Sequence, residues 1–221
     1  MTWVKICGMT NLEDALVAVD AGADAVGFVF YEKSPRYVSV ETAREIVKQM
    51  PSKVDKIGVF VNEQQDRVSA IADQTGLTAV QFHGDEYKNP ERYSIRGKTF
   101  FCLPAVDLLR EMRGQAVFFG LPRLPNAAGV LLDSGNQNKR GGTGKTFAWG
   151  EAHGFVSALG KLYPVVIAGG LSASNVGWAV EYLKPWGVDV VSGVEASPGK
   201  KDPEKVRAFV NAVREADRKA S

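Results

Sequence analysis

The chain opens with Val4-Lys5-Ile6-Cys7-Gly8-Met9-Thr10, which reads as a short apolar strand ending in a cysteine, then a glycine turn, then a helix cap. Thr10 and Glu13 have the spacing of a capping box, in which two residues cap the first helical turn reciprocally. An apolar stripe of helical period follows and ends at Gly22, the usual kind of residue beyond a helix C-cap. The opening therefore predicts one strand–helix unit with a thiol at the end of its strand.

The same unit recurs along the chain. Continuous apolar runs alternate with helical stripes, and strands that are apolar on both faces indicate a parallel sheet covered on all sides. Eight such runs favour a closed (β/α)8 barrel, although an open doubly wound sheet remains as an alternative. The expected strands are residues 4–7, 25–30, 57–61, 77–82, 98–103, 129–133, 165–168 and 188–191. Because no linker divides them, residues 1–221 are expected to form a single α/β domain with the TIM-barrel fold.

The composition narrows the classes of protein. The 221 residues are 45% hydrophobic and 24% charged, which is ordinary for a globular chain. A net charge of +2 without a basic cluster predicts no nucleic-acid partner. No apolar run reaches the roughly 18 residues of a membrane span, and no signal peptide is evident, so a cytoplasmic location and no membrane partner are expected. Two cysteines and two histidines predict neither a disulfide framework nor a zinc site, so no metal-binding residues are expected.

Chemistry in such a barrel is expected at the carboxyl ends of the strands. Cys7 ends the first strand and Asp133 ends the sixth, so the two face each other across the mouth of the barrel. A base and an acid placed this way suit proton transfers at two atoms of a sugar. Taken singly, a buried cysteine most often packs as a small hydrophobe, and a strand-end aspartate often acts as a cap.

Three glycine-rich segments follow the last three strands. Glycine lets the backbone approach an oxyanion, and the loops after the seventh and eighth strands of many barrels hold a phosphate. The alternative is that these glycines only make turns. A nucleotide-binding P-loop is excluded, because its first glycine would fall at Lys139. The expected phosphate-binding residues are Gly142, Gly144, Gly169, Gly170, Ser192 and Gly193.

Two further places carry candidate binding side chains. Arg36 lies in the long loop after the second strand, and its planar guanidinium suits a carboxylate, although a solvated surface arginine is an equal alternative. Gln81 and His83 stand at the end of the fourth strand, where they could touch a substrate. A lone histidine is, however, more often structural.

Seven blocks combine into one pattern. They are KICGMT (5–10), KSPRYV (33–38), QFHGDE (81–86), LDS (132–134), GGTGKTF (141–147), AGGL (168–171) and VSGVE (191–195). In this order and spacing they resemble the phosphoribosylanthranilate isomerase family of tryptophan biosynthesis, from the first expected strand to the last. The chain departs from the family pattern at Phe82, Ala148 and Val191, where leucine, aspartate and serine are usual.

The resemblance implies an Amadori rearrangement, with no cofactor, that turns N-(5-phosphoribosyl)anthranilate into 1-(2-carboxyphenylamino)-1-deoxyribulose 5-phosphate. By the family pattern Asp133 is the general acid at the ring oxygen and Cys7 is the general base at C2. Arg36 is expected to pair with the anthranilate carboxylate. The partner is then a small phosphosugar, and the chain is expected to be a monomer or a homodimer.

Two other functions remain to be weighed. A related isomerase of an aminoimidazole ribotide, by resemblance, uses two aspartates, so a cysteine on the first strand argues against it. A binding protein without turnover would have no need of both Cys7 and Asp133.

Overall fold

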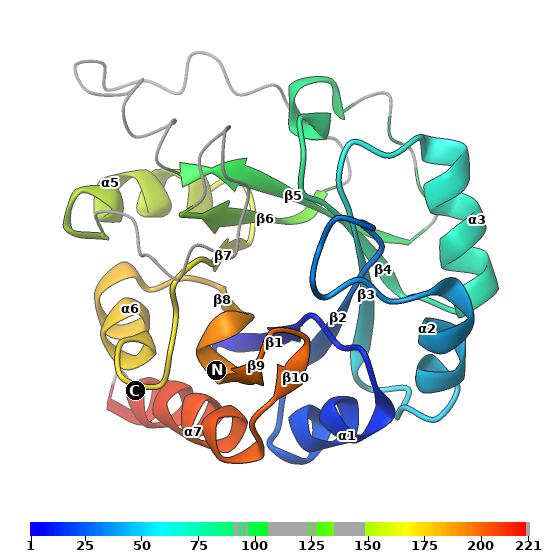
Figure 1. Ribbon diagram of the computed structural model, residues 1–221. Coiled ribbons are helices and arrows are strands. Elements are labelled where there is room, and N and C mark those ends of the chain that lie inside the picture. The colour runs from blue at the N-terminus through cyan, green and yellow to red at the C-terminus, as the bar shows by residue number, and fades with distance from the viewer. Residues whose placement is uncertain are drawn as a thin grey trace.

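The computed structural model describes residues 1–90, 93, 95, 97–105, 124, 127–134 and 149–219. Eight parallel strands form a closed ring in chain order, with helices around its outside (Figure 1). The closed barrel predicted from the sequence is confirmed, and the open-sheet alternative is wrong, because the first strand pairs with the eighth.

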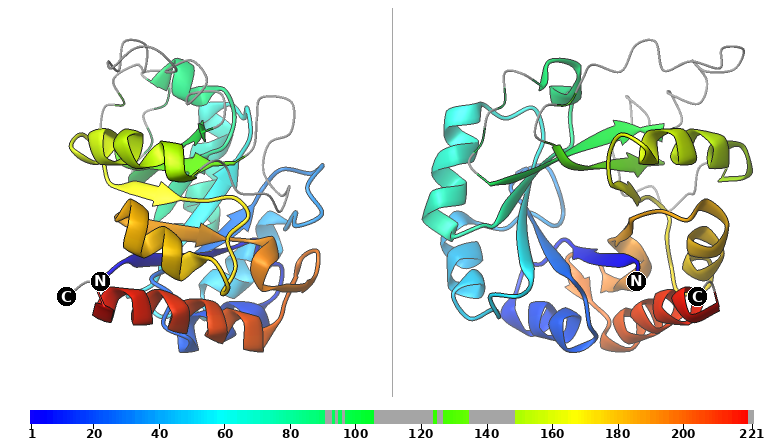
Figure 2. Two further views of the ribbon diagram at one scale, coloured as in Figure 1. Left: turned by 90° about the vertical axis from the view of Figure 1, so that its left-hand side faces the viewer. Right: turned by 180° about the vertical axis from the view of Figure 1, so that it is seen from behind.

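The elements keep the alternation expected from the sequence. The barrel strands are β1 (Trp3–Cys7), β2 (Ala25–Val29), β3 (Asp55–Phe60), β4 (Ala79–Phe82), β5 (Lys98–Pro104), β6 (Ala127–Asp133), β7 (Val165–Ile167) and β8 (Gly187–Val190). The helices outside them are α1 (Leu12–Asp20), α2 (Val40–Val47), α3 (Gln65–Thr75), α5 (Trp149–Gly160), α6 (Val176–Leu183) and α7 (Pro203–Lys219), as two further views show (Figure 2). Short 3-10 turns are η1 (Glu86–Lys88) and η3 (Ser192–Val194). No helix in the described part of the chain combines the length and apolarity needed to cross a bilayer.

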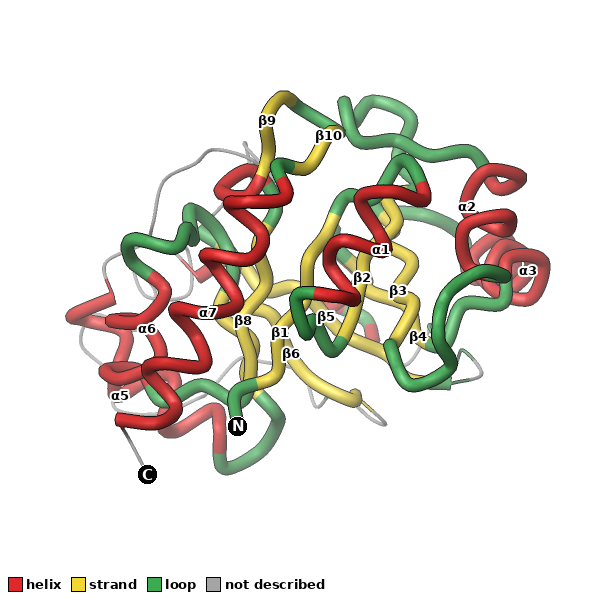
Figure 3. Tube along the Cα trace, turned by 90° about the horizontal axis from the view of Figure 1, so that it is seen from below, coloured by secondary structure: helices red, strands yellow, loops and turns green. Residues whose placement is uncertain are grey.

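One small sheet was not predicted. Strands β9 (Glu195–Ser197) and β10 (Lys200–Lys201) form an antiparallel hairpin after β8. The hairpin stands beyond the carboxyl ends of β1 and β8 (Figure 3). It therefore adds a wall to the face of the barrel on which chemistry is expected.

The cap of α1 differs from the prediction by one residue. Asn11, and not Thr10, is the N-cap, and its side chain accepts a hydrogen bond from the backbone N–H of Asp14. The Thr10 hydroxyl instead donates to the carbonyl of Gly199 at 2.5 Å. A tertiary contact with the β9–β10 hairpin has thus replaced a local cap.

The apolar core has two layers. The larger one lies between the strands and the surrounding helices, and contains Ala15, Val68, Val176 and Phe209, among others. The smaller one fills the inside of the barrel, where Trp3 stacks on Phe100 with ring centroids 5.8 Å apart. Side chains therefore plug the barrel and leave only its mouth open to a ligand.

The ring closes where β8 meets β1, and glycine is required there. A Cβ added to Gly187 would lie 2.9 Å from the Trp3 ring and 3.0 Å from the Trp3 carbonyl oxygen. On the helix α5, by contrast, a Cβ on the exposed Gly154 would meet no atom within 4 Å. These two glycines form a matched pair.

We expect Gly187→Ala to lower the free energy of unfolding by about 1–3 kcal/mol, because the added methyl group overpacks the barrel floor. Gly154→Ala should raise it by about 0.5–1 kcal/mol, because alanine favours a helix over glycine. Chemical denaturation of both variants measures the two changes. Equal effects would show that the β1–β8 contact is not tightly packed.

Candidate active site

A pocket of about 380 Å³ lies at the carboxyl ends of the strands. This size suits a small-molecule ligand. The pocket brings together most of the residues singled out from the sequence: Cys7, Arg36, Gln81, His83, Asp133, Gly169, Gly170 and Ser192. Gly193 lies beside it in η3, while Gly142 and Gly144 fall outside the described residues.

Cys7 is held at the end of β1 by two glycines. Gly8 adopts a φ of 84°, a conformation that glycine tolerates well, and its N–H donates to the carbonyl of Gly27 at 2.9 Å. A Cβ on Gly27 would overlap the Cys7 sulfur, so the bare backbone of β2 makes room for the thiol. Cys7 is only 4% exposed and still lines the pocket.

A buried lysine lies next to this thiol. Lys5, two residues earlier on β1, is fully buried, and its Nζ donates to Gln81 Oε1 at 2.7 Å and to Asp189 Oδ2 at 3.0 Å. The Lys5 side chain and the Cys7 sulfur both lie against Gly27, so the ammonium and the thiol act on each other electrostatically. An ammonium has three N–H donors, so these two oxygen acceptors leave one N–H for a third acceptor, and the Cys7 sulfur lies nearby.

Burial and charge act against each other on these groups. Burial alone would lower the pKa of Lys5, but the Asp189 carboxylate and the Cys7 sulfur outweigh it, and the pKa lies above the usual lysine value. Burial raises the pKa of the Cys7 thiol, and the Lys5 charge opposes that rise without cancelling it. Burial also raises the pKa of Asp189, against the effect of Lys5. Lys5 therefore stays charged, and the thiol is the weaker acid for being enclosed.

Lys5 also sets the orientation of the polar groups on β4. Because an ammonium only donates, the Gln81 side chain must present its oxygen to Lys5. Its NH₂ group then lies 3.3 Å from His83 Nδ1, which must be the acceptor. The His83 proton consequently sits on Nε2, 3.8 Å from the Cys102 sulfur. A neutral imidazole of defined tautomer is thus placed in the pocket.

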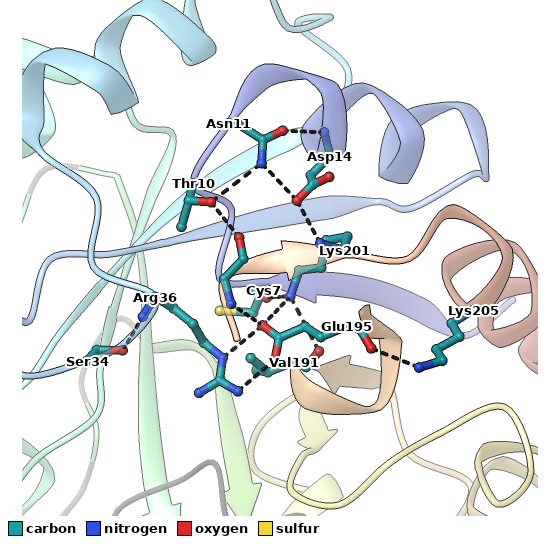
Figure 4. A network of polar contacts seen from close by, with 11 residues as sticks. Cys7, Thr10, Asn11, Asp14, Ser34, Arg36, Val191, Glu195, Lys201 and Lys205 are labelled. Atoms are coloured by element: carbon teal, nitrogen blue, oxygen red, sulfur yellow. Dashed lines mark hydrogen bonds and ion pairs between the residues drawn. The ribbon is translucent and has the colours of Figure 1, made fainter. Parts of the chain in front are cut away.

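Arg36 reaches the pocket from the loop after β2 and binds Glu195 with two parallel hydrogen bonds. The Nε–Oε1 and Nη2–Oε2 distances are 2.9 and 2.7 Å. Figure 4 shows this pair beside Cys7, with the Lys201 ammonium on the far side of the carboxylate at 3.2 Å. The hydrogen bond to Glu195 raises the pKa of Arg36. Burial would raise the pKa of Glu195, but the hydrogen bond from Arg36 and the charges of Lys201 and Arg36 outweigh it and lower that pKa.

This network joins the β9–β10 hairpin to the end of β1. The Lys201 ammonium is almost fully buried and donates to the Cys7 carbonyl at 2.6 Å. The Lys201 backbone N–H donates to Asp14 at the start of α1. Two cations share one carboxylate, so the group keeps a net positive charge beside the pocket, which favours an anionic ligand.

The loop after β7 supplies a backbone cradle. Gly169 and Gly170 have φ angles of 82° and 67°, which only glycine adopts readily. A Cβ on Gly169 would overlap Ser134 in the loop after β6. Asn175 fastens this loop, because its side chain donates to the carbonyl of Gly170 and accepts from the N–H of Ser172. Such exposed backbone N–H groups can bind oxyanions.

Sequence reasoning missed four charged residues of the site: Lys5, Asp189, Glu195 and Lys201. A usable signal existed for the first two, since a lysine and an aspartate interrupt strands that are otherwise apolar on both faces. Nothing comparable marks Glu195 and Lys201, because only the folded hairpin brings them to Arg36. Among the described residues, no three His, Cys, Asp or Glu side chains gather in a way that could hold a metal ion.

The sequence model of the N-(5'phosphoribosyl)anthranilate (PRA) isomerase family matches residues 4–212. The chain belongs to the phosphoribosylanthranilate isomerase family. An isomerase of this name from Pseudomonas aeruginosa (strain LESB58) is 46% identical over 211 residues, which are 96% of this chain and 94% of that protein. One from Geotalea uraniireducens is 43% identical and covers 95% of this chain and 97% of its own. The resemblance seen in the sequence, to an isomerase of tryptophan biosynthesis, is confirmed.

Solved structures of the same family agree with the fold. Phosphoribosylanthranilate isomerase from Thermotoga maritima is 37% identical with a TM-score of 0.82, and covers 97% of this chain and 100% of that chain. A second structure, with a TM-score of 0.75 at 37% identity and the same coverage, is a phosphoribosylanthranilate isomerase in complex with reduced 1-(o-carboxyphenylamino)-1-deoxyribulose 5-phosphate. Both are barrels that match this chain over nearly its whole length.

The Glu195 network yields a stability prediction. Glu195→Gln should lower the free energy of unfolding by about 3–5 kcal/mol, because it leaves the buried Lys201 without its counter-charge. Glu181→Gln, which removes an exposed carboxylate 3.7 Å from Lys219, serves as the control and should change little. Urea denaturation measures both. A loss no larger than that of the control would mean that the Arg36–Glu195–Lys201 group does not stabilise the fold.

Proposed function

We propose that Cys7 and Asp133 carry out the isomerisation of N-(5'-phosphoribosyl)anthranilate as base and acid. The observation that carries this proposal is that both residues line one pocket, from the ends of β1 and β6. The binding groups for two different anions stand on either side of them. The loop after β2 supplies the Arg36 cation beside apolar side chains of β2 and β3. Asp133 follows at the end of β6, and Gly169 and Gly170 follow after β7.

The reaction proceeds by acid-catalysed opening of the ring, followed by the net shift of a proton from C2 to C1. Asp133 gives a proton to the furanose ring oxygen, and the C1–O bond breaks as the anthranilate nitrogen forms a Schiff base. The Cys7 thiolate then takes the proton from C2. The electrons of that C–H bond form the C1=C2 double bond, and the π electrons of the C=N bond move to the nitrogen. The resulting enolamine gains a proton at C1 and loses the proton of its C2 hydroxyl group, which gives the aminoketose. No electron leaves the substrate, so the chemistry needs no redox cofactor and matches the cofactor-free reaction expected from the sequence.

The anthranilate end of the substrate fits the β2–β3 side of the pocket. Arg36 gives two of its five N–H groups to Glu195, which leaves three for a substrate carboxylate. The walls beside it are formed by the apolar parts of Val29, Tyr31, Val59 and Val61. An aromatic ring with a carboxylate matches this combination of an apolar wall and a fixed cation.

The phosphate end fits the β7–β8 side. Gly169, Gly170 and Ser192 line the pocket there, and backbone N–H groups with a hydroxyl bind oxyanions. Val191, where the family usually has serine, lines the same side, so this chain offers one hydroxyl fewer. Contributions from Gly142, Gly144 and Gly193 stay predictions. The wider setting is proposed as well: a cytoplasmic monomer or homodimer that binds a small phosphosugar and neither nucleic acid nor membrane, the Thermotoga maritima relative being described as dimeric.

Turnover tests the two catalytic roles. The purified protein should accelerate isomerisation of the fluorescent anthranilate conjugate, and Cys7→Ser and Asp133→Asn should each lower kcat by at least about 10²-fold, the lower range for one acid–base group. Asp55→Asn is the control, because Asp55 begins β3 at the other end of the barrel. A folded wild-type protein without turnover would refute the function, and full activity in either variant would refute that residue's role.

A second prediction concerns the carboxylate. Arg36→Met should raise KM for the anthranilate conjugate by about 10- to 100-fold with a smaller change in kcat, since a hydrogen bond to a charged group contributes about 1.5–3 kcal/mol. The same substitution should hardly alter KM for the aniline conjugate, which lacks the carboxylate. Lys201 still pairs with Glu195 in this variant, so the site keeps a counter-charge. An equal rise in KM for both conjugates would remove Arg36 from carboxylate recognition.

A further inference from the structure

The ion pair inside the barrel calls for an explanation beyond stability. Lys5 and Asp189 are register partners across the β1–β8 seam and are 0% and 5% exposed. Removing two charges from water is costly, and apolar side chains of similar volume commonly serve a core equally well or better. The cluster that fills the inside of the barrel consists of apolar and aromatic side chains, and the buried Gln81 is a polar side chain that binds the pair. A charged pair at this one level is therefore not required for closing the ring.

The geometry connects the pair with the catalytic sulfur. The position that a Cβ of Gly27 would occupy overlaps the Cys7 sulfur and lies 3.1 Å from Lys5 Cε. The sulfur and the end of the lysine thus lie side by side against the bare backbone of β2. Gln81 Oε1 and Asp189 Oδ2 accept hydrogen bonds from the ammonium at 2.7 and 3.0 Å. The charge can neither swing into solvent nor exchange its neighbours.

We infer that Lys5 is a positioning residue that holds a permanent positive charge against the Cys7 sulfur, so that the thiolate can form inside a closed pocket. This inference rests on the proposed function, in which Cys7 is the base. Asp189 and Gln81 hold the ammonium in place. Asp189 also weakens the effect of Lys5 on the thiol, because the negative charge of the carboxylate opposes formation of the thiolate. Within the part of the chain that the structure describes, Asp189 Oδ1 accepts no hydrogen bond, so the carboxylate charge is not otherwise neutralised.

The proton balance is simple. The Cys7 thiol releases its proton to water, and the resulting thiolate sits between Lys5 and the substrate. When the thiolate takes the C2 proton it becomes a neutral thiol again, and Lys5 returns to balancing Asp189 alone. Lys201 and Arg36 also act on Cys7 with positive charge, and Glu195 offsets them. Of these cations, Lys5 acts most strongly on the thiol, because its side chain and the sulfur lie side by side against Gly27.

The two partners of the ion pair should act on the thiol with opposite sign. Removing the Lys5 charge leaves burial and Asp189, both of which raise the pKa of Cys7, so that pKa should rise further. Removing the Asp189 charge leaves Lys5 unopposed, so the pKa of Cys7 should fall. A purely structural role of the pair would not predict opposite shifts.

The test uses the full chain carrying Cys102→Ala, which leaves Cys7 as the one thiol of the sequence. The pH dependence of alkylation by iodoacetamide, followed by mass spectrometry, reports the pKa of Cys7. Lys5→Met should move the midpoint up, and Asp189→Asn should move it down, each by at least about 1 pH unit, the lower end for a neighbouring charge. Lys56→Met is the matched control, because Lys56 is a buried lysine on β3 that donates to the carbonyl of Pro51 and should leave the midpoint unchanged.

Folding is checked by circular dichroism. If Lys5→Met does not fold, the test uses Asp189→Asn and the double variant Lys5→Met/Asp189→Asn, which buries no unpaired charge. The alkylation midpoint of the double variant should then lie above that of Asp189→Asn. Shifts of the same sign, no shift, or an equal shift in Lys56→Met would overturn the inference. The readout needs no turnover, so opposite shifts in a protein without isomerase activity would refute the proposed function and leave the charge effect standing.

Discussion

The contact between β1 and β8 is the constraint on which the rest of the structure depends. It closes the ring, and it requires Gly187 to accept the Trp3 side chain at the floor of the barrel. One level higher, the same seam sets Lys5 opposite Asp189, and above them Cys7 ends its strand. Barrel closure and the charge around the thiol are thus consequences of one strand pairing. A change that loosens the seam should disturb both.

In the proposed function, the two anionic ends of the substrate bind on different sides of the pocket, because the ring keeps its strands in chain order. The β2 side offers Arg36, whose orientation Glu195 fixes from the β9–β10 hairpin. The β7 and β8 side offers backbone N–H groups around Gly169 and Gly170. Both groups of binding residues are held by further contacts. Asn175 binds the loop after β7, and Lys201 ties the β9–β10 hairpin to the end of β1. Preorganised groups of this kind lower the cost of reaching the transition state.

The eight strands and the ends that carry Cys7 and Asp133 could be predicted, because buried parallel strands are apolar on both faces and their order defines the catalytic face. The β9–β10 hairpin could not be predicted, because its strands are only two or three residues long. It is held by tertiary contacts, such as the hydrogen bond from the Lys201 backbone N–H to Asp14 in the distant helix α1. The N-cap of α1 is Asn11 and not Thr10, because the Thr10 hydroxyl binds the carbonyl of Gly199 in the hairpin. Pairings such as Lys5 with Asp189 depend on which strands meet, and single-strand patterns do not contain that information.

In the proposed mechanism, a lysine that remains protonated stabilises the Cys7 thiolate. The most direct measurement is an NMR titration of one sample labelled with 15N at lysine Nζ and 13C at cysteine Cβ. The Cys7 Cβ shift should titrate first. Lys5 should lose its proton only at higher pH, above the ordinary lysine value, because Asp189 and Cys7 raise its pKa. A Lys5 signal that titrates at or below the pH at which Cys7 ionises would contradict the account, because no cation would then be present when the thiolate forms.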